Sequence, residues 1–273
     1  MIIDSHLHLP PMKEGKTLAD AKKELLQELK RNNVDHAILI PDNIPVSEIG
    51  NLDEILGLVE GDKNLFAMGT IDIQRDREPH IQKLDRLFQT RRIVAVKIFP
   101  GHDPIYPTDK RLIPVYELCI KHDLPVVIHT GANSKNPEPA KYNDPKYIVK
   151  VAKRFSRLKV VIAHYFWPKV EYCHKLTKPY ANIYFDTSGL ADDEVVEETG
   201  IDKIRNVLTL TAKQYPHNVV FGTDYSMCSI KKHITLIKSL PIQAESKERI
   251  FYKNSIRLFK LEPRKQGPIS LRS

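Results

Sequence analysis

The strongest constraint on the fold is a regular alternation of short apolar runs with amphipathic segments. Eight runs are rich in β-branched and aromatic residues, and most are nearly continuous, as expected of strands covered on both faces. They span residues 1–9, 34–41, 64–73, 92–100, 123–131, 158–166, 181–189 and 218–226. Eight strand–helix repeats predict an α/β protein with the (β/α)8 architecture of a TIM barrel.

The same pattern shows no domain break within the 273 residues. An open doubly wound sheet is the rival fold, but it normally carries a Gly-rich phosphate turn after its first strand, and this sequence has none there. We therefore predict a single barrel domain over residues 1–262. Residues 263–273 are predicted to form a flexible C-terminal tail.

Several polar residues and prolines mark the expected helix ends. Thr17 is a suitable N-cap for the segment that follows it, and Pro145 suits the first turn of a helix entered through Asn143-Asp144. Pro114 lies inside the 109–122 pattern, which predicts a late start or a kink. The long 192–215 stretch is helical in character, and further helices are expected near 231–239 and 244–260.

Composition excludes several classes of function. The formal net charge is +8, but basic residues are mixed with acidic ones along the chain, without an arginine-rich arm, so no nucleic-acid partner is expected. No apolar run approaches the roughly 18–20 residues of a membrane span, and no signal-peptide pattern opens the chain. We expect a cytoplasmic protein without a membrane partner. The three separated cysteines (Cys119, Cys173 and Cys228) argue against a disulfide framework.

Polar side chains end most of the predicted strands. Because catalytic groups of such barrels come from the carboxyl ends of the strands, these residues are expected to converge. They are Asp4, His6 and His8 on the first strand, Lys97 on the fourth, His129 on the fifth, His164 on the sixth, Asp186 and Ser188 on the seventh and Asp224 on the eighth. Strand alternation predicts that Asp4, His6 and His8 point the same way.

Four imidazoles and a carboxylate at corresponding strand ends predict a metal site formed by His6, His8, His129, His164 and Asp224. Such ligands suit a divalent ion, with zinc expected and manganese or iron as alternatives. A catalytic ion of this kind lowers the pKa of its water towards 7. Asp224 can bind the ion and take a proton. His164 can polarise a substrate oxygen, act as an acid or base, or hold a second ion.

The motifs DSHLH, VKIFP, VVIHTG, VVIAHY and FGTDYS, with the closing NSIRLFKL, resemble the amidohydrolase superfamily and its amidohydrolase-related branch. The resemblance implies that His6, His8, His129 and Asp224 hold one divalent ion, with His164 as a general acid/base or electrophilic partner. The resemblance allows two alternative roles for Lys97. A carboxylated Lys97 would bridge to a second ion held by His129 and His164, whereas an unmodified Lys97 would pair with a substrate carboxylate.

The loops that follow the strands are expected to determine substrate specificity and to form a partly apolar pocket for a small molecule. The fourth-strand loop holds His102, Asp103 and Tyr106, the sixth Trp167, and the eighth Tyr225. Lys97, Trp167 and Tyr225 are the predicted substrate contacts, and no organic cofactor is expected. Many barrels of this type form homodimers, so a homodimer is a further expectation.

The favoured function is a hydrolase in which activated water attacks a C–N or C–O bond of an amide- or lactone-like substrate. The alternative is a non-oxidative decarboxylase similar to aminocarboxymuconate semialdehyde decarboxylase. Decarboxylases of this branch often place a Glu or Arg near the first motif, where this chain has PPMKEG with a displaced Glu14, and that favours hydrolysis. Less favoured are a TatD-like nuclease, which would have a glutamate in place of Lys97, and a barrel that binds without turnover.

Overall fold

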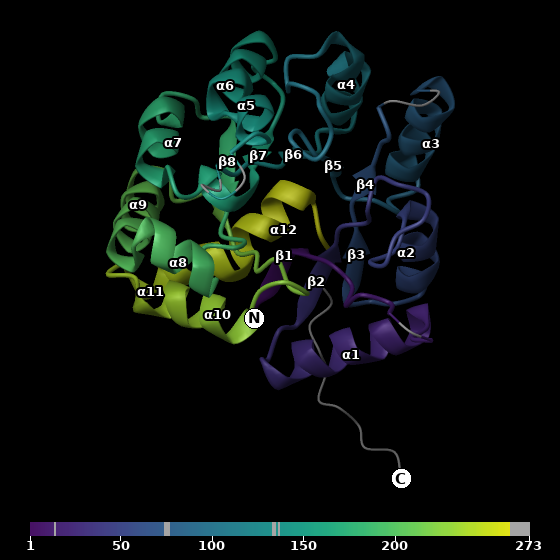
Figure 1. Ribbon diagram of the computed structural model, residues 1–273, viewed down its shortest axis with the longest axis horizontal. Helices are drawn as coiled ribbons and strands as arrows, with labels where there is room; N and C mark the ends of the chain where they lie inside the picture. The colour runs from purple at the N-terminus through teal and green to yellow at the C-terminus, as the bar shows by residue number, and fades with distance from the viewer. Residues whose placement is uncertain (14, 74–76, 133–134, 136, 263–273) are drawn as a thin grey trace.

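The computed structural model describes residues 1–13, 15–73, 77–132, 135 and 137–262, and its ribbon is shown in Figure 1. Glu14 and the predicted tail at 263–273 therefore lie outside the described residues. Within the described ranges, nine short strands lie in the eight predicted runs. They are β1 (Ile3–Leu7), β2 (His36–Leu39), β3 (Leu65–Ala67), β4 (Gly69–Thr70), β5 (Val96–Ile98), β6 (Val126–Ile128), β7 (Val160–Ile162), β8 (Ile183–Asp186) and β9 (Val219–Val220).

All neighbouring strands are parallel, in the orders β1-β2-β3 and β4-β5-β6-β7-β8-β9. The predicted strand 64–73 is divided at Met68, whose amide donates to the Leu39 carbonyl at 2.9 Å, while the Gly69 amide donates to the Ala95 carbonyl at 2.8 Å. At the other edge, the Ser5 amide donates to the Phe221 carbonyl at 2.8 Å. These bonds join the two sheets at both edges, which confirms the predicted (β/α)8 arrangement.

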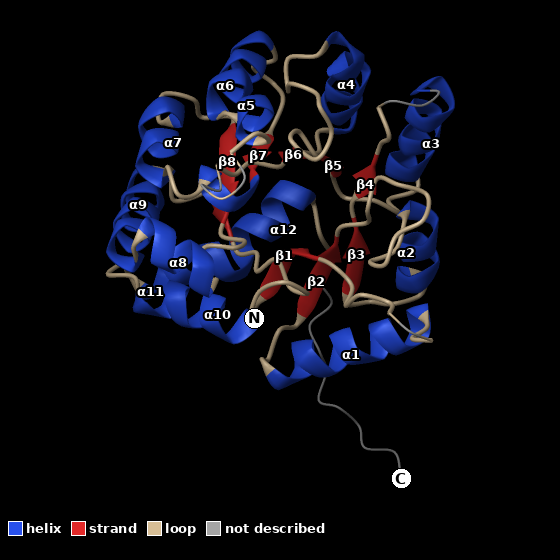
Figure 2. Ribbon diagram, viewed as in Figure 1, coloured by secondary structure: helices blue, strands red, loops and turns tan. Residues whose placement is uncertain are grey.

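Helices surround the strands, as Figure 2 shows. Thr17 is the N-cap of the first helix in a capping box with Asp20, and Pro145 begins another helix, as predicted. The helices are α1 (Leu18–Arg31), α2 (Leu52–Val59), α3 (Arg77–Gln89), α4 (Ile113–His122), α5 (Ala140–Asn143), α6 (Pro145–Arg154), α7 (Val170–Thr177), α8 (Asp193–Thr199), α9 (Ile201–Gln214), α10 (Ile230–Ser239), α11 (Ala244–Glu248) and α12 (Asn254–Phe259).

Three segments differ from a simple strand or helix. Pro114 lies in the first turn of α4, so that helix starts late, after a 3-10 turn at Lys110–Leu112. The 192–215 stretch is two helices, because Gly200 has a φ of 89°, a left-handed value that ends α8. Residues 163–166, predicted as the end of the sixth strand, form a tight turn instead.

Alternate strand residues belong to two apolar layers. One layer packs against the outer helices. The other contains residues from strands on all sides of the barrel, and Leu258 and Phe259 of α12 pack with it. The barrel interior is therefore apolar towards α12, and its polar residues gather at the carboxyl ends of the strands. Among the described helices, none is long and apolar enough to cross a membrane.

His36, at the start of β2, is buried (1% exposed), and its Nδ1 has no hydrogen-bond partner among the described residues. Burial lowers the pKa of His36, with Asp35 partly opposing the shift. The pKa of His36 in the folded protein lies below the unfolded value of about 6.5. The contribution of the neutral, buried ring to the free energy of unfolding is therefore present above that pH and is lost as the pH falls through the folded pKa.

We expect His36→Leu to match or exceed the wild-type free energy of unfolding at pH 7, because no hydrogen bond of Nδ1 is lost. The advantage of His36→Leu should then grow as the pH falls from about 7 to 5. Urea titrations at several pH values measure this difference. A difference that does not change with pH would refute the assignment.

Candidate metal centre

The two histidines of the first motif project from the end of β1. A register shift between Asp4 and Leu7 interrupts the strand. The Nδ1 of His6 lies 2.7 Å from Asp186 Oδ2, and the Nδ1 of His8 lies 2.9 Å from the Ile40 carbonyl. Since both acceptors require a proton on Nδ1, each Nε2 carries the lone pair that a metal ion needs.

Both Nε2 atoms face Asp224, which follows β9. Asp224 Oδ1 lies 3.4 Å from His6 Nε2 and 3.5 Å from His8 Nε2. The Asp224 amide donates to the His6 carbonyl at 2.8 Å, and its φ is 63°. One donor atom each of His6, His164 and Asp224 lies within 4.8 Å of the other two. The residue types and their spacing fit a divalent ion.

His164 reaches the centre from the tight turn after β7. His164, Tyr165 and Phe166 have φ values of 60°, 55° and 56°, three consecutive left-handed residues. The imidazole Nδ1 lies 3.9 Å from Asp224 Oδ2 and 2.9 Å from the Ser188 hydroxyl. Sequence alternation alone places His164 on a strand, whereas this turn carries its side chain into the ligand group.

His129, at the end of β6, is not part of the His6–His164–Asp224 group. Its ring is 4.9 Å from the ring of His164, measured between centroids, and 4.5 Å from that of His102. His102 is an exposed residue of the loop after β5. The rings of His164, His129 and His102 therefore form a row from the centre to the solvent-facing edge. The sequence indicated His102 only as a loop residue.

Lys97, from the middle of β5, is 1% exposed and lies at the centre. Its Nζ is 3.3 Å from His6 Nε2. Burial lowers the pKa of Lys97 to about 8, an effect that the negative charges of Asp186 and Asp224 partly oppose. The amine therefore loses its charge more readily than an exposed lysine does.

Asp186 connects several of these groups, although the sequence alone assigned it no role. Asp186 Oδ1 accepts hydrogen bonds from the amides of His164 and Ser188, each at 3.1 Å, while Oδ2 pairs with His6. The signal available in the sequence was its place at the end of the seventh strand run. A carboxylate behind a ligand histidine fixes the ring orientation and raises its basicity.

Asp4 does not point with His6 and His8 as strand alternation predicted. Its carboxylate accepts from the Thr223 hydroxyl at 2.5 Å and from the amides of Thr223 and His6. The reason is the register shift, which adds a residue to β1 relative to β2 between Asp4 and Leu7. Asp4 therefore joins β1 to the end of β9.

Trp167 and Tyr225, the two aromatic residues predicted to contact the substrate, have different surroundings. A Cβ at Gly189 would be 3.5 Å from His164 Nδ1 and 4.0 Å from Trp167 Nε1, so the indole borders the centre. Tyr225 follows Asp224, but its phenol packs with the outer core layer. Burial and the charges of Glu24 and Glu28 in α1 raise the pKa of Tyr225 to about 12.

Electrostatics favour the form that binds a cation. Burial lowers the pKa of His164 to about 3 and lowers the pKa of His6 as well, so both imidazoles are neutral near pH 7. Burial opposes ionisation of Asp224, but the neighbouring imidazoles of His164, His8 and His6 outweigh it and hold its pKa well below the usual range. The centre thus offers neutral nitrogens and an ionised carboxylate.

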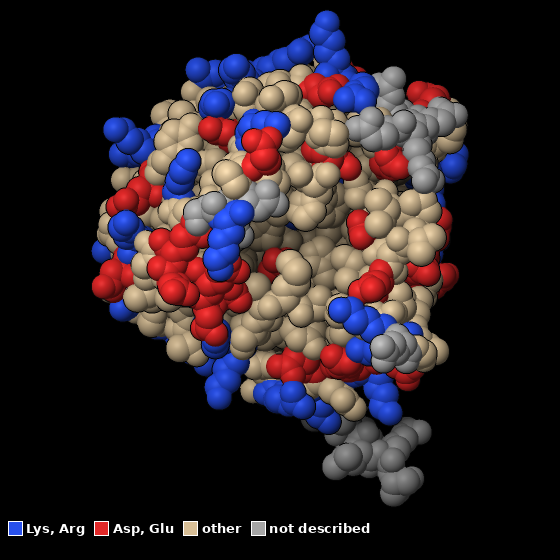
Figure 3. All heavy atoms as spheres, viewed as in Figure 1, with Lys and Arg blue, Asp and Glu red and all other residues tan. Residues whose placement is uncertain are grey.

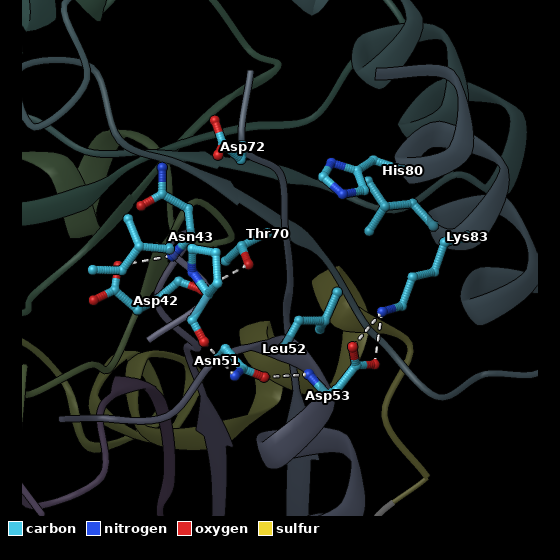
Figure 4. A pocket seen from close by; sticks show the side chains of 12 residues that line it. Asp42, Asn43, Asn51, Leu52, Asp53, Thr70, Asp72, His80 and Lys83 are labelled. Carbon is cyan, nitrogen blue, oxygen red and sulfur yellow. Dashed lines mark hydrogen bonds and ion pairs between the residues drawn. The ribbon is translucent and has the colours of Figure 1, made fainter. Parts of the chain in front are cut away.

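The surface above the strand ends is hollowed near its centre, and acidic side chains gather over α8 beside it (Figure 3). A separate cavity of about 280 Å³ lies at the ends of β2 and β4 (Figure 4). Asp42, Asn43, Thr70, His80 and Lys83 line it, and Lys83 is paired with Asp53 at 2.6 Å. The Asn43 amide donates to Asp103 at 2.7 Å, which links this cavity to the loop that carries His102. None of the predicted substrate contacts Lys97, Trp167 and Tyr225 lines this cavity.

The fold and the centre together define a (β/α)8 barrel with a buried His–His–Asp group suited to a divalent ion. The chain belongs to the amidohydrolase family, whose profile matches residues 3–261. This confirms the resemblance found in the motifs. A search of curated protein sequences finds no match.

Solved structures share the fold over nearly the whole chain. An uncharacterised TIM-barrel protein from Bordetella bronchiseptica has 20% identity and a TM-score of 0.75, covering 95% of this chain and 98% of its own. 5-Carboxyvanillate decarboxylase from Novosphingobium aromaticivorans, complexed with manganese and 4-hydroxy-3-methoxy-5-nitrobenzoic acid, has 13% identity and a TM-score of 0.68, covering 96% of both chains. An amidohydrolase from Burkholderia multivorans with bound zinc has 14% identity and a TM-score of 0.69, covering 96% of this chain and 100% of its own.

Proposed function

We propose that this protein is a metal-dependent hydrolase of amide- or lactone-like C–N or C–O bonds in a small substrate that can carry an anionic group. The observation that carries the proposal is the position of the Asp224 carboxylate. It lies 3.4 Å and 3.5 Å from the Nε2 atoms of His6 and His8, beside the neutral imidazole of His164. Family membership and enzymes with the same fold support this class of chemistry.

In this proposal His6, His164 and Asp224 hold the ion, and His8 completes the set through Nε2. Zinc is proposed because three of the donors are imidazoles, and manganese is the alternative. When bound, the ion polarises a substrate oxygen and lowers the pKa of a water molecule. His129 is proposed to face the substrate, because its ring lies between those of His164 and His102.

Asp224, His164 and Lys97 are proposed to have separate roles in the reaction. Asp224 is ionised and can accept a proton from the attacking water. His164 is neutral and held by Ser188, so its ring keeps a fixed orientation. Lys97 supplies a buried amine beside His6 and can donate to an anionic oxygen of the substrate.

Decarboxylation is the second candidate, and Lys97 is the observation that favours it. A cation buried at the centre would pair with the carboxylate that is lost as carbon dioxide. The manganese-containing decarboxylase with the same fold supports this reading. Glu14, whose displaced position in PPMKEG weighed against decarboxylation, is not among the described residues. The nuclease, the cytoplasmic location and the homodimer remain predictions of the sequence alone.

The direct test combines metal analysis with product analysis. We expect the purified protein to bind one transition ion per chain and to open a lactone or cleave an amide in a substrate panel that also includes 5-carboxyvanillate. Release of carbon dioxide from the aromatic acid, without hydrolysis of the other compounds, would favour decarboxylation. No bound ion and no activity after addition of zinc, manganese or cobalt would refute both candidates, and digestion of DNA would favour the nuclease.

The number of ions depends on Lys97. We propose one ion and an unmodified amine, because Lys97 Nζ lies 3.3 Å from a ligand nitrogen of His6. Native mass spectrometry should show no addition to Lys97 and one ion per chain. A mass gain of one carbon dioxide at Lys97, together with two ions, would instead establish the bridged site.

A further inference from the structure

Three buried threonines flank residues of the metal centre. Thr130 follows His129, Thr187 follows Asp186, and Thr223 precedes Asp224. Their exposed fractions are 1%, 0% and 0%. Each hydroxyl both donates and accepts a hydrogen bond, and the bond that it donates reaches a neighbouring strand end or turn. These side chains therefore connect the segments that present the ligands.

Thr130 holds the turn that carries His164. Its hydroxyl donates to the Ala163 carbonyl and accepts from the Phe166 amide, the latter at 2.9 Å. These two backbone groups stand on either side of His164 and Tyr165 in the chain. The left-handed conformation of His164, Tyr165 and Phe166 is unfavourable for residues with a Cβ, so the turn depends on contacts that fix it.

Thr187 makes the corresponding connection beneath His6. Its hydroxyl donates to the Gly222 carbonyl at 2.9 Å and accepts from the Gly222 amide at 3.1 Å. Gly222 approaches β1 so closely that a Cβ there would lie 2.8 Å from His6 Cβ. Gly222 lies two residues before Asp224. The Thr187 hydroxyl thus fixes the segment that leads to Asp224 and against which His6 packs.

We propose that Thr130 and Thr187 are positioning residues, whose hydroxyls hold His164 and His6 in the arrangement that binds the ion. This inference rests on the proposed function, since it assumes an ion at His6, His164 and Asp224. Neither hydroxyl contacts that donor set, so each acts through the backbone. Valine has the shape of threonine but cannot pair with either backbone group, which leaves a buried carbonyl and amide without a partner.

Cobalt binding tests the proposal, because the visible absorption of cobalt reports ligand geometry independently of turnover. We expect Thr130→Val and Thr187→Val to bind Co²⁺ about 10–100-fold more weakly than the wild type and to change its absorption spectrum. Thr130→Ser keeps the hydroxyl and should restore both. Thr209→Val is the matched control, because Thr209 is a buried threonine whose hydroxyl has no partner among the described residues.

The outcomes separate the two proposals. If the wild type binds no cobalt, the proposed metal centre is wrong and this inference falls with it. If the wild type binds cobalt, and folded Thr130→Val and Thr187→Val keep its affinity and spectrum, only the positioning role is wrong. Thr130→Ala, which lacks both the hydroxyl and the γ-methyl group of threonine, replaces Thr130→Val if that variant does not fold. An effect of Thr209→Val as large as that of Thr130→Val would also overturn the inference.

Discussion

Replacing Asp224 with asparagine should abolish turnover. The substitution keeps the size of the side chain but removes the negative charge that faces His6, His8 and His164. It thereby removes both an anionic ligand and the proton acceptor of the proposed reaction. We expect kcat/KM to fall by about 10²–10⁴-fold or more, on the substrate that the panel identifies. The zinc dissociation constant, measured by competition with a chelator, should rise.

The control is Asp202→Asn on α9, because that side chain is 95% exposed and lies outside the centre. It should match the wild type in kcat/KM and in metal content. If Asp224→Asn kept near-wild-type activity with its metal retained, the assignment of Asp224 would be wrong. A loss of metal without a loss of activity would contradict the proposed role of the ion.

Replacing Asp186 with asparagine should weaken metal binding although Asp186 is not a proposed ligand. The asparagine side chain would present one oxygen where the carboxylate now pairs with His6 and accepts from the amides of His164 and Ser188. The His6 ring then loses the partner that keeps its proton on Nδ1. We expect an affinity for zinc about 10–100-fold lower, and a free energy of unfolding lower by about 1–3 kcal/mol.

The stability effect of Asp186→Asn should depend on pH in a defined direction. Burial alone would raise the pKa of Asp186, but the adjacent His6 ring, which donates a hydrogen bond to it, together with His164 and Lys97, holds it well below the usual range. Its contribution is therefore present above the unfolded value of about 3.9 and is lost as the pH falls through the folded pKa. Denaturation of the metal-free protein at pH 7 and below pH 4 measures this.

Asp192→Asn, which alters the N-cap of α8 and not the centre, is the control for Asp186→Asn. It should leave the zinc affinity unchanged. A wild-type zinc affinity in Asp186→Asn would show that the carboxylate does not orient His6. A stability loss that persists undiminished at acidic pH would show that its charge is not the stabilising feature.

Local sequence signals predicted most of the secondary structure. The apolar runs located the strands, and Thr17 and Pro145 marked helix starts, because capping and a fixed φ act within one turn of the chain. The signals were weaker where a tertiary contact controls the backbone. The turn at 163–166 has a β-rich sequence, but the Thr130 hydroxyl and the Asp186 carboxylate bind its backbone from other strands.

The sequence also predicted part of the candidate site. His6, His8, His164 and Asp224 converge as expected, because parallel strands of a barrel bring their carboxyl ends together. The role of Asp186 was not foreseen, since a carboxylate that binds a ligand histidine has no spacing that marks it in the chain. Tyr225 was assigned to the substrate as an aromatic residue of the eighth-strand loop, and that assignment stays a prediction, while the structure shows the side chain packed against the outer core layer.

The sequence by itself determined the number and order of the strand–helix repeats and which polar residues end the apolar runs, because periodicity and position in a run are properties of a single chain segment. Only the tertiary structure decided which of those residues share one small volume. The register shift in β1 removes Asp4 from the ligand face, and the left-handed turn after β7 places His164 beside Asp224. Both depend on hydrogen bonds between strands far apart in sequence, so no local pattern predicts them.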